Sequence, residues 1–134
     1  MKMSSKARYG LYVAVELAKN YNDDVMVNVA SLSQSTGVTE KYLEQIIALM
    51  KKGNVVSATR GSNGGYRLTD SPDNITVGRI LRAVEDNLEI VDCLHSGCAN
   101  SKKCVARNLW GKLYDNINSY LDTVSLKQLA EDNV

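Results

Sequence analysis

The sequence predicts a mainly α-helical fold with one small β-hairpin, arranged as a winged helix-turn-helix domain with a long C-terminal helix. Two helical segments meet at Thr36-Gly37-Val38, and two β-prone segments flank the glycine-rich stretch 60–65. Near the end of the chain, apolar residues recur at helical spacing over 109–124. A chain of 134 residues that is 44% hydrophobic can bury a core of this kind without disulfides.

A first helix is expected at the N-terminal end of the chain. Ser4 or Ser5 can cap it, and it reaches about Tyr21. Its apolar face is expected to comprise Leu11, Ala14, Val15 and Ala18. Residues 22–24 then form a turn, and 25–27 are β-prone.

Two further helices form the expected helix-turn-helix. Asn28 caps a helix over 29–36, which Gly37 ends. Thr39 opens the next helix, which runs to about Lys52. The buried stripe of this third helix is expected to be Leu43, Ile46, Ile47 and Met50.

The opposite side of the third helix is polar. It carries Lys41, Gln45, Ala48 and Lys52. Its N-terminal end presents Thr39, Lys41, Tyr42 and Gln45. These residue types bond phosphates and base edges, and the N-terminal end of a recognition helix is the part that enters a major groove. A solvated helix face is the alternative interpretation.

A hairpin follows, with strands expected at 55–59 and 66–69 around the tip Arg60-Gly-Ser-Asn-Gly-Gly65. A hairpin after a helix-turn-helix is a wing, and an arginine at its tip suits a narrow minor groove. The tip is not a phosphate-binding P-loop, because the lysine and Ser/Thr are missing and no helix follows. Taken alone, it would be an ordinary tight turn.

The second half contains a loop at 71–74 and a fourth helix that Thr76 caps. The apolar face of the fourth helix is Val77, Ile80, Leu81 and Val84. An irregular segment over 87–102 separates it from a long helix that is expected to run from about Cys104 to Thr123.

The long helix carries an apolar stripe: Leu109, Trp110, Leu113, Ile117, Tyr120, Leu121 and Val124. Such a stripe favours a seam between two copies of the chain, with packing on its own domain as the alternative. Ser125-Leu-Lys-Gln128 matches a capping box and opens a short last helix.

Charge and composition narrow the function classes. Residues 1–69 carry nine Lys/Arg and five Asp/Glu, a balance of +4, whereas 70–134 carry seven and ten, a balance of −3. A basic half joined to an acidic half is typical of a nucleic-acid face beside a separate partner face, although ordinary scatter also explains it. There is no apolar run long enough for a membrane span and no signal segment, so we expect a cytoplasmic protein without a membrane partner. One histidine without a matching catalytic motif argues against an enzyme and a small-molecule substrate.

The three cysteines lie within twelve residues, at Cys93, Cys98 and Cys104. Three thiolates in a short loop can converge on a soft metal centre. Iron–sulfur ligation, a zinc site completed by His95, a disulfide switch and three merely reduced thiols all remain open from the spacing.

Several segments resemble one family. The opening Ser4-Ser-Lys-Ala-Arg-Tyr-Gly-Leu11, then Tyr42-Leu-Glu-Gln45, then Arg60-Gly-Ser-Asn-Gly-Gly-Tyr66 are similar to the Rrf-type winged-helix regulators over nearly the whole chain. The cysteine triplet followed by Leu109-Trp110 resembles the branch of that family that binds a cluster and regulates iron–sulfur cluster assembly.

The resemblance implies a homodimeric transcriptional repressor of cluster-biogenesis genes that binds a partly palindromic operator in double-stranded DNA. It places Thr39, Lys41, Tyr42 and Gln45 at the major groove, with Glu44 tuning site choice, and Arg60 and Gly61 in the minor groove. It implies an iron–sulfur cluster of the 2Fe–2S type on Cys93, Cys98 and Cys104. The chain then divides into a DNA-binding domain (1–86), a cluster-binding loop (87–104) and a dimerisation helix with a short C-terminal helix (105–134).

The chain departs from the cluster-binding pattern at one ligand position. Arg107 stands where such relatives carry a histidine ligand, and four rather than five residues separate the first two cysteines. Nitric-oxide-sensing relatives use an acidic residue near the N-terminus, where this chain has Arg8. The fourth ligand is therefore open among His95, Asp92, Asn108 and an outside thiol. Alternative functions are a repressor of cysteine metabolism, a nitric-oxide or redox sensor of the same family, and a zinc-containing interaction module.

Overall fold

The computed structural model describes residues 2–22, 24–95, 97–100 and 102–134. Asp23 of the expected turn, and Ser96 and Ser101 of the expected irregular segment, lie outside the described residues. The elements are α1 (Ser5–Lys19), α2 (Val29–Thr36), α3 (Glu40–Lys52), β1 (Val56–Thr59), β2 (Gly65–Leu68), α4 (Val77–Val84), the 3-10 turn η1 (Asp92–Leu94), α5 (Arg107–Thr123) and α6 (Leu126–Ala130). The predicted mainly helical fold with one hairpin is confirmed.

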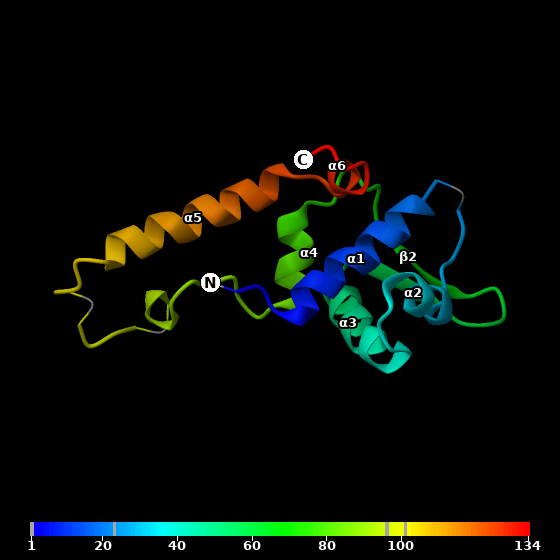
Figure 1. Ribbon diagram of the computed structural model, residues 1–134, viewed down its shortest axis with the longest axis horizontal. Helices are drawn as coiled ribbons and strands as arrows, with labels where there is room; N and C mark the ends of the chain where they lie inside the picture. The colour runs from blue at the N-terminus through cyan, green and yellow to red at the C-terminus, as the bar shows by residue number, and fades with distance from the viewer. Residues whose placement is uncertain (1, 23, 96, 101) are drawn as a thin grey trace.

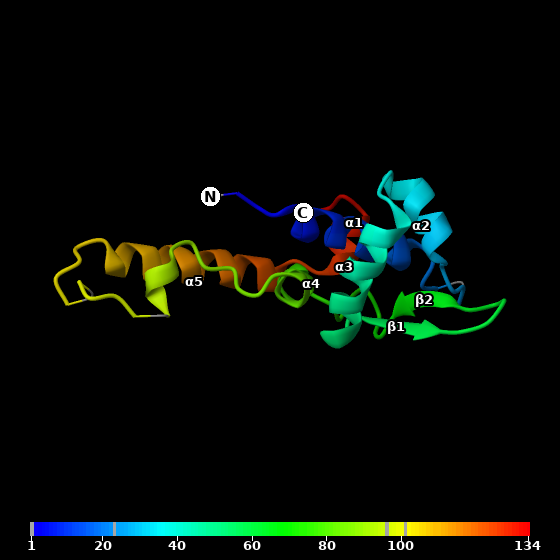
Figure 2. The ribbon, with the colours of Figure 1, turned by 90° about the horizontal axis from the view of Figure 1, so that it is seen from below.

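Figure 1 shows the arrangement of these elements. The helices α1 to α4, α6 and the hairpin form one body, and α5 projects from it toward the segment that carries the cysteines. The hairpin tip and the cysteine segment therefore lie at opposite ends of the molecule (Figures 1 and 2). In the part of the chain that the structure describes, no helix is both long and apolar enough to cross a bilayer.

Side-chain caps begin most of the helices where the sequence predicted. In each case a side-chain oxygen accepts a hydrogen bond from the backbone N–H three residues further on, which satisfies a donor that the helix leaves free. The capping residues are Ser4, Asn28, Thr39, Thr76 and Ser125. The predicted capping box is confirmed, because the Gln128 side chain also accepts from the Ser125 backbone N–H at 2.9 Å.

The start of α5 differs from the prediction. The helix begins at Arg107, not near Cys104, and Ala106 precedes it without a side-chain cap. The backbone between the cysteine and the helix is occupied by turns: Lys103 N–H donates to the Asn100 carbonyl at 2.9 Å, and Arg107 N–H donates to the Cys104 carbonyl at 3.4 Å. Cys104 is therefore an exposed residue of a turn.

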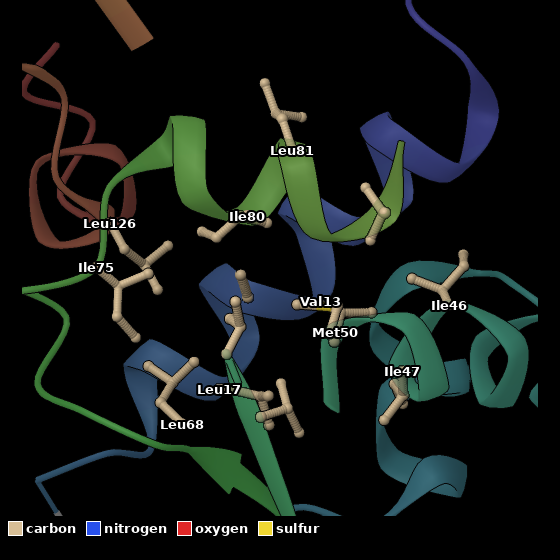
Figure 3. Close-up of a cluster of buried hydrophobic side chains, with 14 of the residues drawn as sticks. Val13, Leu17, Ile46, Ile47, Met50, Leu68, Ile75, Ile80, Leu81 and Leu126 are labelled. Carbon is tan, nitrogen blue, oxygen red and sulfur yellow. The ribbon is translucent and has the colours of Figure 1, made fainter. Parts of the chain in front are cut away.

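The core is built mainly from one face of each of α1, α3 and α4, and α2, the hairpin, Ile75 and α6 add further buried side chains (Figure 3). The predicted stripes of α3 and α4 are confirmed, since all eight of their residues are buried. The prediction for α1 was partly wrong. Its buried residues are Ala7, Gly10, Val13, Ala14 and Leu17, and Leu11, Val15 and Ala18 only border the core.

Close approach to α4 explains this rotation of α1. A Cβ placed on Gly10 would lie 3.1 Å from a methyl group of Val84. The small residues Ala7, Gly10 and Ala14 thus let the two helices pack closely, and a count of large apolar residues does not detect such a face.

The hairpin is antiparallel, and Val56 pairs with Leu68 at one end and Thr59 with Gly65 at the other. The first strand begins one residue later than expected and ends as expected at Thr59, and the second is shifted one residue toward the N-terminus. The β-prone segment before α2 joins the sheet only as a bridge: Val27 and Tyr66 exchange backbone hydrogen bonds of 2.9 and 2.7 Å. This bridge ties the wing to the body.

The last helix fixes the base of α5. Leu126 N–H donates to the Ile75 carbonyl at 2.7 Å, and Val77 N–H donates to the Val124 carbonyl at 2.9 Å. Leu126 is fully buried in the core. The short helix that the sequence assigned to the 105–134 segment therefore packs with the winged-helix body.

Gly65 provides a test of the wing bridge. Its φ is +150°, and a Cβ there would lie 2.7 Å from the Val27 carbonyl oxygen. We expect Gly65→Ala to lower the free energy of unfolding by more than about 1 kcal/mol, because the backbone must move to admit the methyl group. Urea unfolding followed by circular dichroism measures the change.

Gly111 is the matched control for this variant. It lies in α5, and a Cβ there meets nothing within 4 Å. Gly111→Ala should raise the free energy of unfolding by up to about 1 kcal/mol, because alanine is the better helix former. Equal effects of the two substitutions would contradict a close contact at Gly65.

Candidate nucleic-acid interface and cysteine segment

The outward side of α3 forms the first part of the candidate interface. Burial of its apolar stripe turns the opposite side to solvent. The exposed residues on that side are Lys41, Glu44, Gln45, Ala48, Lys51 and Lys52. The structure thus exposes every predicted residue of this face, and it adds Lys51, which sequence reasoning missed although it lies three residues after Ala48.

Two of the predicted contact residues also have structural partners. The Thr39 hydroxyl caps α3, accepting from the Tyr42 N–H at 3.4 Å. The Tyr42 ring is half-buried and meets the Tyr9 ring edge-on, with centroids 6.1 Å apart. Tyr42 therefore braces α3 against α1 as well as standing at the N-terminal end of the outward side.

The wing forms the second part. Arg60 and Gly61 are exposed at the tip, where Gly61 has φ +111° and open space around it. A groove separates the wing from α3. From the wing it is lined by Thr59, Arg60 and Gly61, and from α3 by Glu44, Ala48 and Lys51, among others. Residues Lys51 and Arg60 place cationic groups on the two sides of this groove.

Hydrogen bonds and an ion pair at the base of the wing hold it relative to α3. The Asn54 carbonyl accepts hydrogen bonds from the Thr69 hydroxyl and from Arg79 Nη2, each at 2.6 Å. The Arg67 guanidinium, on β2, pairs with the Asp24 carboxylate and lies over the Tyr21 ring.

At the end of the wing, hydrogen bonds from the Asn74 side chain and the Ser71 backbone lower the pKa of Asp70.

The cysteine segment lies along the far half of α5. Cys98 and Cys104 are exposed, and Cys93 is half-buried. All three thiols are free of disulfides. Among the described residues, His, Cys, Asp and Glu side chains do not gather in any group of three that could hold a metal ion. The soft thiolate donors suit an iron–sulfur cluster, but this arrangement does not bring them together.

Arg107 binds the segment through its backbone. Its Nη1 and Nη2 donate to the carbonyls of Cys93 and Leu94, both at 3.2 Å. Arg107, the first residue of α5, therefore holds η1 in place. The sequence comparison considered Arg107 only as a replacement for a histidine ligand and did not predict this contact. The guanidinium geometry, with parallel donors in one plane, explains why a single side chain can hold two successive carbonyls.

The open candidates for a fourth ligand have different surroundings. His95 Nδ1 pairs with the Glu89 carboxylate, and the His95 ring meets the Tyr114 ring edge-on at 5.2 Å between centroids. Asn108 is exposed on the first turn of α5. Asp92 begins η1. These positions and contacts single out none of the three as a ligand.

Comparison with known proteins gives one consistent result. Residues 3–132 match the Rrf2 family, described as an iron-dependent transcriptional regulator. The regulator IscR of Aliivibrio salmonicida is 35% identical over 134 residues, covering 99% of this chain and 79% of its own length. The regulator CymR of Bacillus subtilis is also 35% identical, over 130 residues, covering 97% of this chain and 90% of its own length.

Solved structures agree with these matches. The structure of B. subtilis CymR, the global cysteine regulator, superposes with a TM-score of 0.80 at 34% identity, covering 98% of this chain and 97% of that one. The structure of T. potens IscR gives a TM-score of 0.80 at 30% identity, covering 100% of this chain and 89% of that one.

A helix-turn-helix with a polar outward side, followed by a wing with an arginine tip, defines a winged-helix transcriptional regulator. With its matched range of 3–132, the chain belongs to the Rrf2 family, whose members are transcriptional regulators rather than enzymes. DNA binding is implied by that family.

The clamp at Arg107 can be tested in the protein without any metal. We expect Arg107→Ala to increase the rate of Cys93 alkylation by iodoacetamide on the order of tenfold, because loss of two charge-assisted hydrogen bonds favours opening of η1. Peptide mass spectrometry gives the rate at each thiol. Cys98 and Cys104 serve as internal controls, since both are already exposed and should keep their rates. An unchanged Cys93 rate would show that other contacts hold this turn.

Proposed function

We propose that the chain is a homodimeric repressor that binds a partly palindromic operator and controls genes for iron–sulfur cluster biogenesis, with a 2Fe–2S cluster on its cysteines setting the operator affinity. The observation that carries the DNA-binding part is the groove between α3 and the wing, with cationic side chains on both sides. A groove of this kind suits the phosphate backbone of a duplex.

In this proposal the two arms read different grooves of the DNA. The N-terminal end of α3 enters the major groove and presents Thr39, Lys41, Tyr42 and Gln45. Glu44 stands beside them and discriminates among sites, because a carboxylate accepts from cytosine and repels phosphate. Arg60 enters the minor groove, and Gly61 leaves room for the backbone there.

The dimer is proposed to form along α5. None of the residues of this helix is fully buried within the chain. The side chains of Leu109 and Tyr120 are 59% and 58% exposed. Leu113, Ile117 and Leu121 recur every four residues and so lie on one face of the helix. Packing on its own domain, the alternative, accounts for part of the stripe only, since Leu121 and Val124 are its only members that contact the core of the described chain.

The cluster is proposed to be held by Cys93, Cys98 and Cys104. When bound, a cluster supplies a cross-link between thiols that the sequence spaces over twelve residues. Such a cross-link requires the segment to close, and this closure would order the connection between α4 and α5. Arg107 cannot ligate, so retention should be weaker than with a histidine at that place.

A repressor of cysteine metabolism is the second candidate. The observation in its favour is the likeness to B. subtilis CymR: the CymR and IscR sequences are each 35% identical to this chain, and the CymR and IscR structures each give a TM-score of 0.80. The thiols also do not join other His, Cys, Asp or Glu side chains of the described residues in a group that could hold a metal ion. A nitric-oxide or redox sensor and a zinc-containing module are further outcomes of the metal analysis.

Operator binding tests the wing. We expect Arg60→Ala to weaken operator binding by about 1–3 kcal/mol, because it removes a minor-groove contact. Fluorescence anisotropy with labelled duplex at several salt concentrations gives the affinity, whose logarithm should fall by about 0.9 per phosphate contact for each unit of log salt. Lys127→Ala is the charge-matched control, since Lys127 lies on α6 and pairs with Asp73. Equal losses from the two variants would place the wing away from the DNA.

Charged substitutions on the Leu113–Leu121 face of α5 test the proposed dimer. Ile117→Glu and Leu121→Glu should give monomers with weak operator binding, because each substitution would bury carboxylates without a partner in an apolar contact. Sedimentation equilibrium measures the dimer, and circular dichroism confirms that the monomer is folded. Ser119→Glu, an exposed position of the same helix away from the Leu113–Leu121 face, is the control. A dimer that survives both seam substitutions places the interface elsewhere.

Anaerobic reconstitution tests the cofactor. We expect iron and acid-labile sulfide to bind together, and each Cys→Ser substitution at 93, 98 or 104 should remove most of the visible absorption while leaving a folded dimer. Arg107→His should slow cluster loss, because imidazole can ligate. One zinc per chain without sulfide favours the module with His95, and neither metal favours the cysteine-metabolism repressor.

A further inference from the structure

The tip of the wing carries an asparagine directly before a glycine, at Asn63 and Gly64. Figure 2 shows the loop between β1 and β2 extending beyond the helices, and Asn63 is exposed in it. Within the described part of the chain no hydrogen bond holds the Asn63 carboxamide, so this group can turn toward its own backbone. An asparagine in this position can react with the backbone nitrogen of the next residue, which converts the side chain from an amide to an acid.

Glycine at position 64 is required by the fold of the wing. A Cβ there would lie 2.1 Å from the Thr59 carbonyl oxygen, which belongs to the backbone and cannot swing aside. Any other residue would therefore displace the strand. The absence of a side chain also lets the Gly64 nitrogen approach the Asn63 carboxamide, because a Cβ is what hinders this approach in other residues. The reactive pair is thus a consequence of how the wing is built.

One hydrogen bond restrains the pair. The Gly64 N–H donates to the Gly61 carbonyl at 3.0 Å, which closes a turn over 61–64. The nitrogen must leave this bond before it can attack. An exposed hydrogen bond of this kind slows the opening by about tenfold or less, since its net free energy is small. Around Gly61, which has φ +111°, the described structure leaves open space, so packing adds little to this restraint.

The reactive pair lies beside the proposed DNA contacts. Gly64 lines the groove between α3 and the wing, together with Arg60 and Lys51. Asn63 precedes Gly64 and follows Arg60 by three residues. A carboxylate formed at position 63 would therefore add negative charge to the tip that is proposed to approach phosphates.

We infer that Asn63 is a site of spontaneous deamidation and that the reaction lowers the affinity of the wing for DNA. The Gly64 nitrogen gives its proton to a solvent base and bonds to Cγ of Asn63, and the bond between Cγ and the side-chain nitrogen breaks. That nitrogen takes up a proton and leaves as ammonia. Water then opens the succinimide ring at Cγ, which gives an aspartate, or at the backbone carbonyl carbon, which gives an isoaspartate with an extra carbon in the main chain. No electrons are gained or lost, and water is the co-reactant.

The product changes the wing in charge and in length. Its carboxylate repels the phosphates that Arg60 attracts. The isoaspartate also lengthens the chain between Thr59 and Gly65, which pair across the hairpin. DNA that holds the turn closed should slow the reaction, because the Gly64 N–H then stays bonded to Gly61. These effects on DNA rest on the proposed function, whereas the chemistry at Asn63 does not.

The first experiment follows the chemistry in the protein alone. The full chain is kept at mildly alkaline pH, and peptide mass spectrometry measures the conversion of each asparagine over time. We expect Asn63 to convert at least about tenfold faster than Asn133, which is also exposed but precedes Val134. The Asn63→Gln chain should show no such conversion in the wing, since the longer side chain closes the corresponding ring far more slowly. Equal rates at Asn63 and Asn133 overturn the inference, whatever the protein binds.

The second experiment measures the effect on DNA. The probe is a labelled duplex selected from a random pool with the unmodified chain, and fluorescence anisotropy gives the affinity. Asn63→Asp supplies the aspartate product directly and should weaken binding about tenfold at low salt. Asn133→Asp is the same change away from the wing and should leave the affinity unchanged. After ageing, the wild-type chain should lose affinity in proportion to its conversion at Asn63, and the Asn63→Gln chain should keep it.

The third experiment compares bound and free protein. An excess of the selected duplex should slow conversion at Asn63 several-fold and leave the rate at Asn133 unchanged. Unaltered affinity of both the Asn63→Asp variant and the aged chain overturns the effect on DNA that we infer. A chain that selects no duplex but still converts at Asn63 overturns the proposed function and the effect on DNA, and leaves the modification site standing.

Discussion

Burial of one side of α3 is the constraint on which the rest of the structure depends. Leu43, Ile46, Ile47 and Met50 are at most 2% exposed, so the helix cannot rotate about its axis without exposing apolar surface. Its polar side must then face solvent. The chain leaves α3 at Gly53, whose Cβ would lie 2.6 Å from that of Ala83, and enters β1 at once. The direction of the wing is therefore fixed by the same packing that turns the polar side of α3 outward.

The corner at Asn54 makes that direction rigid. Its carbonyl accepts from a wing residue, Thr69, and from a residue of α4, Arg79. The Val27–Tyr66 bridge holds the opposite strand of the hairpin. The outward side of α3 and the wing thus belong to one packed unit, whereas the cysteine segment is joined to it through α5 and the 85–91 connection. The two candidate sites differ in this respect: one is built into the core, and the other lies beyond it.

What the sequence could predict follows the same division. Caps such as Thr39 and Ser125 are local signals, and the α3 and α4 stripes are periodic ones, so both were read correctly. The buried side of α1 was not, because close approach at Gly10 depends on a helix more than sixty residues away. The Arg107 clamp was missed for a related reason: its acceptors are backbone carbonyls, which every residue has, so no residue type marks them. The groove between wing and α3 likewise depends on tertiary packing.

The bracing at the base of α5 has a mechanical consequence. Hydrogen bonds from Arg82 to Asn118 and Asp122, together with the Thr76–Ser125 bridge, join the last turns of the helix to the body. The helix spans 17 residues, or about 25 Å, so a tilt of α5 by about 5° moves its distant end by about 2 Å. These contacts hold the C-terminal end of α5 against the body, so α5 and the body move together. A displacement of the distant end of α5 would therefore tilt α5 together with the body that carries α3 and the wing.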